Sequence, residues 1–597
     1  MKLIFTESYP TLKAKLSSVG GEWDETQSGK KVLRLDGGVM NWFEGTGTIQ
    51  FQGKPDKKDA LERLVVSALA PEIDLPPVER PSPPPDISQS KKINTPPILD
   101  NIAAQHLKGE FTESEIIIGI VSAVGTESSR VINPLKDRVG QFGYSVEEIK
   151  ISSLLSAQQA SLDGSSEYIR IKALMQAGDQ LRESTKNNAI LSYGAAKRIQ
   201  EARSDSSKKR AYIINSLKHP EEVELLRKIY GQGFYLFGIH ADPKRRLHYL
   251  MNDKGLSQSE ALEVTKTDED ENITHGQRTR DTYHLADFFI NLGKNDDQVK
   301  NTIQRFLELI LSHPYRNPTF DEFAMFMAFS SSVRSGDLSR QVGAVITKER
   351  QIIATGANDS PKSGGGLYWA EIDENSGIVS DTPQGKDYTR GEDSNKSEQT
   401  EIIREILSQI NDLNAEQEVT EQAFKGIQAI LEKSRIRDLT EFGRVVHAEM
   451  EALLSCSRSD ISCADSDLYC TTFPCHNCAK HIIAAGIKRV IYVEPYPKSK
   501  ALEFHSDSVE LNTTLESSKP SDNVTFEPFT GVGARRFLDF FSMNLGAGSK
   551  LKRKSSDGLT VDWDKTKAKA RVPLLPISYL NTEAQAAAVF NSETANS

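Results

Sequence analysis

The stretches VHAEM (residues 446–450) and FPCHNC (residues 473–478) decide how the largest part of this chain is organised. The first stretch supplies His447, and the second supplies Cys475 and Cys478. Imidazole and thiolate groups are ligands that zinc prefers, and three protein ligands leave the fourth corner of a tetrahedral ion open for water. The two stretches therefore predict a zinc site that carries chemistry.

Glu449 follows His447 by two residues and is well placed to move protons at that water. His-x-Glu followed by Pro-Cys-x-x-Cys is the established signature of zinc nucleobase deaminases, in which the glutamate is the general acid and base. A closed structural zinc site is the alternative, and it needs a fourth ligand. His476 is expected to point away from the metal, and His481 is expected on a helix surface. The pattern therefore favours hydrolytic deamination.

Composition indicates a multidomain protein without disulfides. The chain has 597 residues, of which 38% are hydrophobic and 26% charged, and its net charge is −10. This length predicts more than one domain. The negative charge argues against nucleic-acid binding by the whole chain, although a local basic face remains open. No apolar stretch approaches the roughly 18 residues of a membrane span, so neither a span nor a signal peptide is expected.

All five cysteines lie between residues 456 and 478. This crowding fits a metal site in a reducing compartment, so we expect a cytoplasmic protein. The three cysteines outside the Cys-x-x-Cys pair are expected to be small buried or surface residues; they are Cys456, Cys463 and Cys470.

Residues 1–70 predict a small α+β module. Residues 31–35 and 46–52 alternate apolar and polar side chains, as strands with one buried face do, and residues 59–66 have helical spacing. The stretch from 38 to 53 resembles small TATA-binding-protein-like modules, which implies a nucleic-acid platform. A docking or oligomerisation module is nevertheless the favoured interpretation, and the nucleic-acid platform is the alternative.

Two segments are expected to lie outside the folded domains. Residues 71–110 contain nine prolines, which favour extended polyproline II and predict a semi-rigid linker. Residues 546–597 form a tail with a basic run, and we expect disorder from about residue 581 onward.

Residues 111–315 predict an α/β domain that begins as P-loop kinases do. A buried strand at 115–121 precedes a loop and a helix at 131–142, and a second strand follows at 144–151. In P-loop kinases the N–H groups of this loop and the helix N-terminus hold phosphates. The corresponding residues of this degenerate loop are Gly125, Thr126, Ser128 and Ser129.

The phosphate loop departs from the kinase pattern. Glu127 stands where the second glycine would be, and Ser128 stands where the lysine would be. A carboxylate repels phosphate, and no lysine remains in the loop to reach it. Asn215 also stands where such folds often keep an acidic magnesium-binding residue. A kinase-like domain without phosphotransfer is therefore favoured; nucleotide binding without turnover and an active kinase are the alternatives.

Residues 316–545 predict a three-layer α/β/α domain around a mixed sheet. A helix at 323–333 leads into a hairpin of strands at 340–346 and 351–355. Helices and strands then alternate, with the zinc motifs at helix starts. Residues 370–435 are polar and then helical, and they interrupt the domain as an insertion.

This part of the chain resembles the deoxycytidylate deaminase family, which shares the zinc motifs and the stretches SGDLSRQVGAV (335–345) and GIKRVIY (486–492). A closer likeness is to bacterial anti-phage dCTP deaminases, which join a P-loop kinase-like domain to a cytidine-deaminase-like domain. That likeness rests on NDSPKSGGGLYW (358–369) and FEPFTGV (526–532). The resemblance implies Zn²⁺-dependent hydrolysis of dCTP and dCMP, and a role in depleting dCTP during phage infection.

The family match also implies substrate contacts. Asn358 would contact the deoxyribose, and Tyr492 would lie near the base or pack in the core. A triphosphate needs several donors. The candidates, each of which could instead form a surface salt bridge, are Arg334, Arg340, Lys362, Lys498 and Lys500.

Three classes of function remain open: a free-nucleotide deaminase acting in defence, a deaminase acting on cytosine in single-stranded DNA or RNA with residues 1–70 as platform, and a non-catalytic zinc scaffold. Glu449 argues against the scaffold, and the net negative charge argues against the polynucleotide editor. The resemblance further implies control by a repressing RNA or protein partner. We also expect a homo-oligomer.

Overall fold

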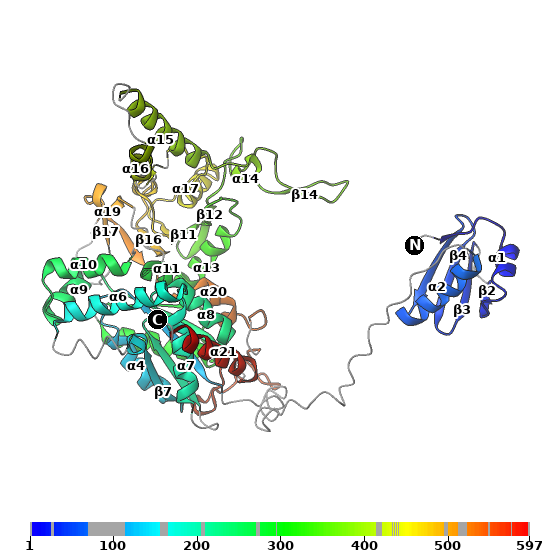
Figure 1. Cartoon of the computed structure of the whole chain (residues 1–597), viewed down its shortest axis with the longest axis horizontal. Helices are drawn as coiled ribbons and strands as arrows, with labels where there is room; N and C mark the ends of the chain where they lie inside the picture. The colour runs from blue at the N-terminus through cyan, green and yellow to red at the C-terminus, as the bar shows by residue number, and fades with distance from the viewer. Residues whose placement is uncertain are drawn as a thin grey trace. The chain divides into compact units, whose positions relative to one another are not determined.

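The computed structural model describes residues 3–25, 29–69, 114–155, 165–203, 209–269, 275–293, 295–413, 421–432, 434, 436, 439, 441–494, 499–511, 522–546, 550–574 and 576–594. The predicted linker at 71–110 and Lys498 lie outside these residues. The chain divides into two compact units, Met1–Thr95 and Pro96–Ser597 (Figure 1).

The first unit is a five-stranded antiparallel sheet with two helices. Its strand order is β1-β5-β4-β3-β2. The core contains Leu33, Met40 and Trp42 from the sheet together with Leu12 and Val65 from the helices. The alternating segments predicted at 31–35 and 46–52 are present as strands. The bounds are β1 Leu3–Ile4, α1 Tyr9–Lys15, β2 Glu22–Asp24, β3 Lys30–Leu35, β4 Gly38–Phe43, β5 Thr48–Gly53 and α2 Pro55–Leu69.

The second unit contains two six-stranded sheets. The first, called the β6 sheet, has the order β19-β10-β9-β6-β8-β7, and its strands are parallel except for β19 at the edge. Its strands are β6 Ile116–Ser122, β7 Ser145–Lys150, β8 Arg210–Asn215, β9 Phe234–His240, β10 Phe288–Asn291 and β19 Gly531–Val532. Every residue of β6 is buried, as expected for a central parallel strand.

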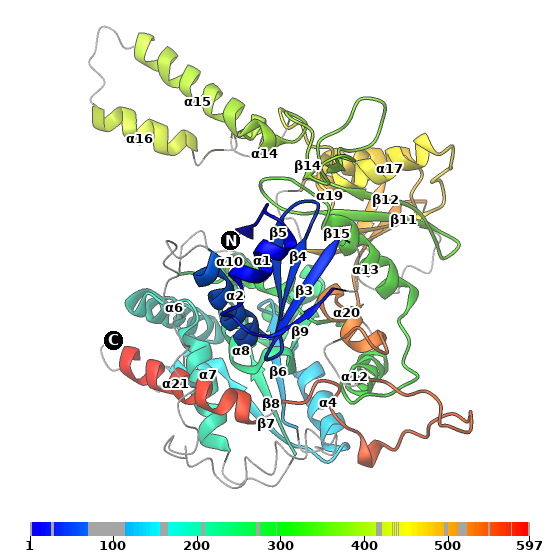
Figure 2. The same cartoon turned by 90° about the vertical axis from the view of Figure 1, so that its right-hand side faces the viewer.

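Helices cover the β6 sheet, and Figure 2 shows several of them around its strands. They are α4 Ser129–Gly140, α6 Glu167–Thr185, α7 Ile190–Ala202, α8 Pro220–Tyr230, α9 Pro243–His248, α10 Gln258–Glu269, α11 Thr279–Tyr283 and α12 Asp296–Ile310. The chain leaves β6 toward β8 and β7, whereas it leaves β9 toward β10. The carboxyl ends of β6 and β9 therefore form the position at which open α/β sheets bind ligands.

The second sheet, called the β15 sheet, has the order β12-β11-β15-β16-β18-β17. Strand β11 is antiparallel to both neighbours, while β15, β16, β18 and β17 are parallel, so the sheet is mixed as predicted. The strands are β11 Gly343–Lys348, β12 Gln351–Ala357, β15 Asp467–Thr472, β16 Arg489–Glu494, β17 Val509–Leu511 and β18 Val524–Pro528.

Helices pack on both faces of the β15 sheet. Ala344 and Ile346 of β11 share a hydrophobic cluster with α17, and Val345 between them shares another with α13. The structure therefore has the three-layer α/β/α arrangement that the sequence predicts. The helices are α13 Phe320–Ser332, α17 Ala448–Arg458, α18 His476–Ala484 and α19 Ala501–Phe504. Helix α20, Ala534–Phe541, packs against α13 and the β6 sheet.

The predicted boundary between residues 315 and 316 does not separate two compact domains. One buried cluster contains Ile117 and Phe289 of the β6 sheet together with Val345 and Ile491 of the β15 sheet. Strand β19, which follows the β15 sheet in sequence, pairs with β10 of the β6 sheet. The two halves therefore form one unit, because they share their core and a strand.

The insertion at 370–435 is built from a short hairpin and helices. These are β13 Glu371–Ile372, β14 Val379–Ser380, α14 Asp387–Arg390, α15 Ser394–Leu413 and α16 Glu421–Glu432. Helices α15 and α16 extend away from the body of the second unit (Figures 1 and 2). None of the described helices is long and apolar enough to cross a membrane.

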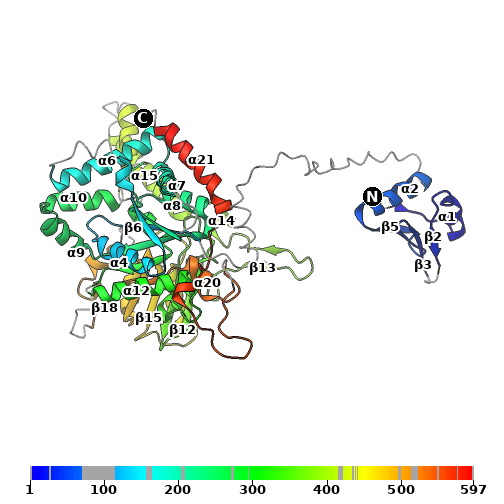
Figure 3. The same cartoon turned by 90° about the horizontal axis from the view of Figure 1, so that it is seen from below.

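The expected disorder from residue 581 is wrong for the described part of the tail. Helix α21, Pro576–Thr594, packs along α7 (Figure 3). Tyr579, Ala586 and Ala587 are buried, and Asn591 accepts a hydrogen bond from Lys197 of α7. The polar composition near the chain end suggested disorder. The helix is ordered by its contact with α7, and the local sequence carries no clear sign of that contact.

Candidate metal centre and substrate cavity

The two ligand-bearing segments lie at the starts of two helices that contact each other. His447 is the N-cap of α17, and Cys475 is the N-cap of α18, so each helix begins one residue later than its first ligand. Cys478 lies in the first turn of α18. Its N–H donates to the sulfur of Cys475 over 3.4 Å. The positive ends of both helix dipoles therefore favour thiolate at this position.

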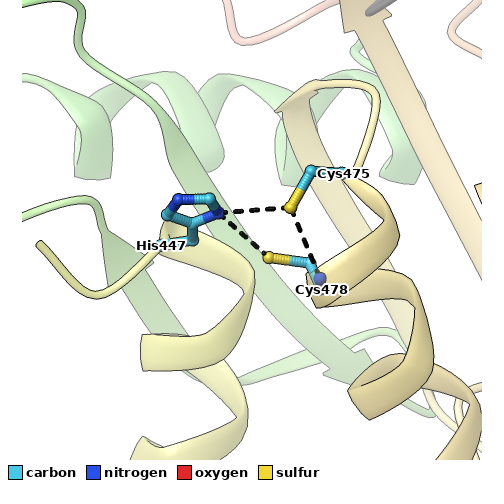
Figure 4. Close-up of side chains that lie close together, drawn as sticks. All are labelled: His447, Cys475 and Cys478. Carbon is cyan, nitrogen blue, oxygen red and sulfur yellow. Dashed lines mark hydrogen bonds between the residues drawn. The ribbon is translucent and has the colours of Figure 1, made fainter. Parts of the chain in front are cut away.

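The side chains of His447, Cys475 and Cys478 point toward one another (Figure 4). The Nδ1 atom of His447 lies 3.4 Å from Sγ of Cys475 and 3.3 Å from Sγ of Cys478. The three donor atoms all lie within 4.8 Å of one another. One nitrogen and two sulfur donors at this spacing fit a tetrahedral zinc ion with one open position. The predicted ligands are therefore gathered at one point.

Protonation at the site also suits a metal. The hydrogen bond from Cys478 and the neighbouring His447 lower the pKa of the Cys475 thiol to about 3. The same hydrogen bond and burial raise the pKa of Cys478. A zinc ion at this position would be held by both groups as thiolates.

Glu449 is buried in the first turn of α17 and lines the cavity beside the metal centre. Burial raises the pKa of its carboxyl group, and the nearby His447 opposes that rise. Cys470 of β15 lies close to it: burial first, and then the charge of Glu449, raises the pKa of the Cys470 thiol. Cys470 is therefore a neutral neighbour of the glutamate rather than a metal ligand.

A close contact between helix and sheet sets the position of Glu449. At Gly356 of β12, a Cβ atom would lie 2.1 Å from the carbonyl oxygen of Ala448 and 2.6 Å from the nitrogen of Ala452. Only glycine permits this approach, so α17 lies directly on the hairpin. The loop after β12 adds a second link, because Asp359 and Val446 exchange backbone hydrogen bonds of 3.3 and 3.0 Å.

A cavity of about 520 Å³, called the zinc cavity, opens beside these residues. Three predicted substrate residues line it: Asn358, Arg340 and Lys500. The insertion and the loop that follows it also form part of its wall, which the sequence did not suggest. The lining residues that sequence reasoning missed include Asp337, Asp387, Asn395, Arg444 and Phe504. Asp337 lies in the stretch SGDLSRQVGAV, but the other four lie outside the motifs described above, because only the tertiary fold brings them to the zinc cavity.

The side-chain amide of Asn358 is held by the loop that precedes β11. Its Oδ1 accepts from the N–H of Val342 over 2.6 Å, and its Nδ2 donates to the carbonyl of Arg340 over 2.8 Å. The hydroxyl of Ser335 donates to the Asn358 carbonyl over 2.6 Å. Asn358 therefore fixes the loop that carries Arg340 at the mouth of the zinc cavity.

The structure places three other predicted residues away from the zinc cavity. The guanidinium of Arg334 lies 3.6 Å from the ring centroid of Trp369. Lys362 is exposed and pairs with Glu371 over 3.3 Å. Tyr492 is buried, and its ring meets that of Phe473 edge-on at 4.8 Å between centroids. Of the two positions expected for Tyr492, the structure has the one in the core.

The loop that the sequence predicts to be a degenerate phosphate loop lines a separate cavity of about 340 Å³, called the loop cavity. Gly125, Thr126 and Ser128 belong to its wall, whereas Ser129 does not. Ser128 is the N-cap of α4, and Gly125 has φ +80°. Glu127 pairs with Arg245 over 2.6 Å, so its charge is offset within the protein.

Lys218, from outside the loop, reaches this region. Its Nζ donates to the carbonyl of Ser122 and to Asp268, each over 2.7 Å. Lys218 is thus a lysine beside this loop, and its charge is paired with a carboxylate. Asn215 donates to Glu148 over 3.0 Å, so it joins a side-chain network at the end of β8.

Comparison with known proteins places residues 318–494 in the family described as the cytidine and deoxycytidylate deaminase zinc-binding region. ComE operon protein 2 of Bacillus subtilis is 47% identical over 90 residues, which are 14% of this chain and 48% of that protein. Mouse deoxycytidylate deaminase is 34% identical over 105 residues, 18% of this chain and 53% of that protein. The chain thus spans about half the length of these two relatives.

A solved structure and a phage enzyme match over longer parts of their own lengths. The dCMP deaminase of cyanophage S-TIM5, in complex with dCMP and dUMP, is 21% identical, and the match covers 36% of this chain and 98% of that one with a TM-score of 0.20. Deoxycytidylate deaminase of Enterobacteria phage T2 is 31% identical over 176 residues, 29% of this chain and 79% of that enzyme. The zinc motifs lie within the matched family region, and the chain belongs to the deoxycytidylate deaminase family.

Proposed function

We propose that this chain is a zinc-dependent hydrolase that converts free deoxycytidine nucleotides to deoxyuridine nucleotides and ammonia. One observation carries the proposal. The donor atoms of His447, Cys475 and Cys478 lie within 4.8 Å of one another at the wall of the cavity that Glu449 lines. This arrangement combines a metal centre with an open position, a buried proton carrier and a space for substrate.

The residues divide the chemistry between them. Zinc, when bound by His447, Cys475 and Cys478, lowers the pKa of water so that hydroxide is available near neutral pH. Glu449 takes the proton from the attacking water and gives it to N3 of the cytosine ring. Oxygen adds at C4, the bond from C4 to the amino nitrogen breaks, and Glu449 helps to protonate the leaving ammonia. The raised pKa of Glu449 suits both directions of this transfer.

Cationic residues around the zinc cavity are suited to the phosphates of a nucleotide. Arg340, Arg444 and Lys500 line it, and the loop that carries Arg340 is fixed by Asn358. Arginine and lysine are the usual partners of phosphate oxygens. We therefore include both dCMP and dCTP as substrates.

The use of dCTP and a role in phage defence rest on the resemblance to bacterial anti-phage dCTP deaminases. Supporting features are the parallel β6 sheet before the deaminase region and the glycine-containing loop between β6 and α4. Depletion of a nucleotide pool harms the host as well as the phage, so we include control by a repressing RNA or protein.

The test is a substrate panel with the full-length, zinc-loaded protein. dCMP, dCTP and a cytosine-containing single-stranded oligonucleotide are incubated separately, and ammonia and the uracil product are measured. Release of dUMP or dUTP supports the proposal. Uracil in the oligonucleotide alone would replace it with polynucleotide editing, and no product from any of the three would leave a zinc scaffold.

A further inference from the structure

A third cavity lies between the two sheets of the second unit, and we call it the inter-sheet cavity. Its volume is about 340 Å³. One wall comes from the carboxyl ends of β6 and β9, where Ala123, His240 and Ala241 lie. The opposite wall comes from the β15 sheet and includes Phe473 and Tyr492.

This position is where the β6 sheet is expected to bind a ligand. The chain leaves β6 and β9 in opposite directions, and ligands of open α/β sheets bind outside the carboxyl ends of such a strand pair. In this protein the deaminase half closes the other side of that crevice. A volume above 300 Å³ with mainly apolar lining is also typical of small-molecule sites.

Two polar atoms of the wall have no hydrogen-bond partner among the described residues. They are the Tyr283 hydroxyl and Nε2 of His240, both buried, with ring centroids 6.5 Å apart. Buried polar groups almost always have a partner. Burial lowers the pKa of His240 to about 4, so its ring is neutral and can both donate and accept.

The charged residues nearby largely neutralise each other. Arg246 donates to Glu269 over 2.7 Å, and both line the cavity. Arg280 also lines the cavity and takes part in an interaction within the protein. Most of the remaining wall is aromatic or aliphatic, with Phe473, Tyr492, Leu502 and Leu511 as the main members. Such a wall suits an uncharged flat ring with hydrogen-bonding groups along one edge.

We propose that the inter-sheet cavity binds an uncharged nucleoside, with its base among Tyr283, Phe473 and Tyr492 and the polar edge of the base against His240 and the Tyr283 hydroxyl. Glu269 lines the same cavity and accepts hydrogen bonds from the sugar hydroxyls. This site is separate from the zinc cavity and takes a molecule without phosphate.

Phe473 connects the two cavities, since it lines both. It lies two residues before Cys475, and its N–H donates to the carbonyl of Glu494 over 2.7 Å. Ser499, which also lines the inter-sheet cavity, donates to the carbonyl of Pro474 over 2.8 Å. A bound nucleoside therefore contacts the segment that holds a zinc ligand, which couples its binding to deamination.

Binding is tested with uridine and inosine on the full-length, zinc-loaded protein by isothermal titration calorimetry. Neither nucleoside has an exocyclic amino group, so neither is consumed by a deaminase. Ala241→Phe fills the cavity and is expected to abolish binding. Tyr283→Phe removes one hydrogen bond and is expected to weaken binding about tenfold.

Tyr235→Phe is the matched control. It removes another buried tyrosine hydroxyl, but Tyr235 lies at the start of β9, at the opposite end of the strand from His240, and does not line the cavity. The Tyr235→Phe variant should bind uridine and inosine as tightly as the unmodified protein does. If neither nucleoside binds, or if Ala241→Phe binds as tightly as the unmodified protein with a normal melting curve, the site is refuted. Binding in the zinc cavity would survive Ala241→Phe, so that substitution separates the two sites.

The coupling rests on the proposed deaminase function, and a second measurement tests it. Saturating inosine should change kcat/KM for dCMP at least twofold in the unmodified protein and in Tyr235→Phe, but not in Ala241→Phe. Unchanged kinetics with intact binding would refute the coupling alone. A protein that binds inosine but deaminates nothing would refute the proposed function and leave the binding site standing.

Discussion

Glu449 and Glu451 lie two residues apart on α17, but their surroundings differ. Both are buried, yet Glu449 lines the zinc cavity whereas Glu451 pairs with Arg458. Glu449→Gln keeps the shape of the side chain and removes the proton carrier. We expect kcat for dCMP to fall about 10³-fold, since general acid–base catalysis contributes roughly 10²–10⁴. Steady-state kinetics with zinc content measured on the same sample gives the result.

Glu451→Gln is the matched control for this substitution. It changes the same group on the same helix outside the zinc cavity, so kcat should stay within about threefold of the unmodified value. Equal losses in the two variants would show that the effect comes from α17 and not from proton transfer by Glu449.

The Asn358 amide holds two backbone groups of one loop, so its removal should affect stability and substrate affinity together. Asn358→Ala leaves the N–H of Val342 and the carbonyl of Arg340 without their partner. We expect a loss of about 2 kcal/mol in the free energy of unfolding, because an unpaired buried group costs roughly 1–3 kcal/mol. Urea denaturation and KM for dCMP measure the two effects.

Asn477→Ala provides the comparison, because the hydrogen bond that Asn477 accepts from Lys480 is exposed. Its free energy of unfolding should change by less than about 0.5 kcal/mol. A stable Asn358→Ala variant with a raised KM would instead indicate direct contact with the sugar, as the family resemblance implies.

At the level of the secondary-structure elements, α21 is tied to the β6 sheet by a buried charged cluster. Glu583 is fully buried and pairs with Arg203, which also pairs with Glu115, and the hydroxyl of Tyr230 donates to Glu583. Glu583→Ala should lower the free energy of unfolding by about 3 kcal/mol, since breaking a buried pair costs roughly 3–5 kcal/mol. Chemical denaturation followed by circular dichroism measures this loss.

Glu593→Ala, on the same helix, removes a carboxylate that accepts from Asn187 over 3.1 Å. This variant should lose no more than about 1 kcal/mol. If the two substitutions cost the same, the buried cluster does not anchor α21.

Local sequence patterns were sufficient to predict the elements whose buried residues follow a regular spacing over a short stretch. The apolar run of β6 and the helical spacing of α13 predict those elements within a few residues. In contrast, β19 has only two residues and is a strand because β10 pairs with it. Helix α21 depends in the same way on α7. Such elements are fixed by distant contacts, so no local window contains their signal.

The same distinction applies to the candidate site. Ligand type and spacing were enough to select His447, Cys475 and Cys478, because a metal centre demands particular donor atoms. Phosphate binding does not select particular arginines or lysines in the sequence in this way. Arg334 and Lys362, which were predicted to contact phosphate, lie outside the zinc cavity. The residues of the insertion that line the zinc cavity were missed because they lie far from the zinc ligands in the sequence.

For the whole molecule, the division into two compact units makes a direct prediction. The first unit has its own core around Trp42, and the second contains both sheets. A chain that lacks Met1–Thr95 should therefore fold and deaminate dCMP with kcat within about twofold of the full-length value. Activity assays and a melting curve on the truncated chain test this.

Tryptophan fluorescence follows the two units in the intact protein. Trp23 and Trp42 belong to the first unit, while Trp369 and Trp563 belong to the second. Independent units should give two transitions in the intact chain, one of which disappears on truncation. A single transition that shifts on truncation would show that the units stabilise each other. If a repressing partner still acts on the truncated chain, the first unit is not its receptor.

The pairing of β19 with the β6 sheet has a consequence for folding of the protein during its synthesis on the ribosome. Domains usually fold as they emerge, beginning with the N-terminal one. Here the first five strands of the β6 sheet, which end at Asn291, keep an open edge until Val532 has been made, and the face of α7 waits for α21. Of the two sheets of the second unit, the one that emerges first is thus finished last. A chain that stops before Gly531 would lack the strand that pairs with β10, so its β6 sheet would keep an open edge.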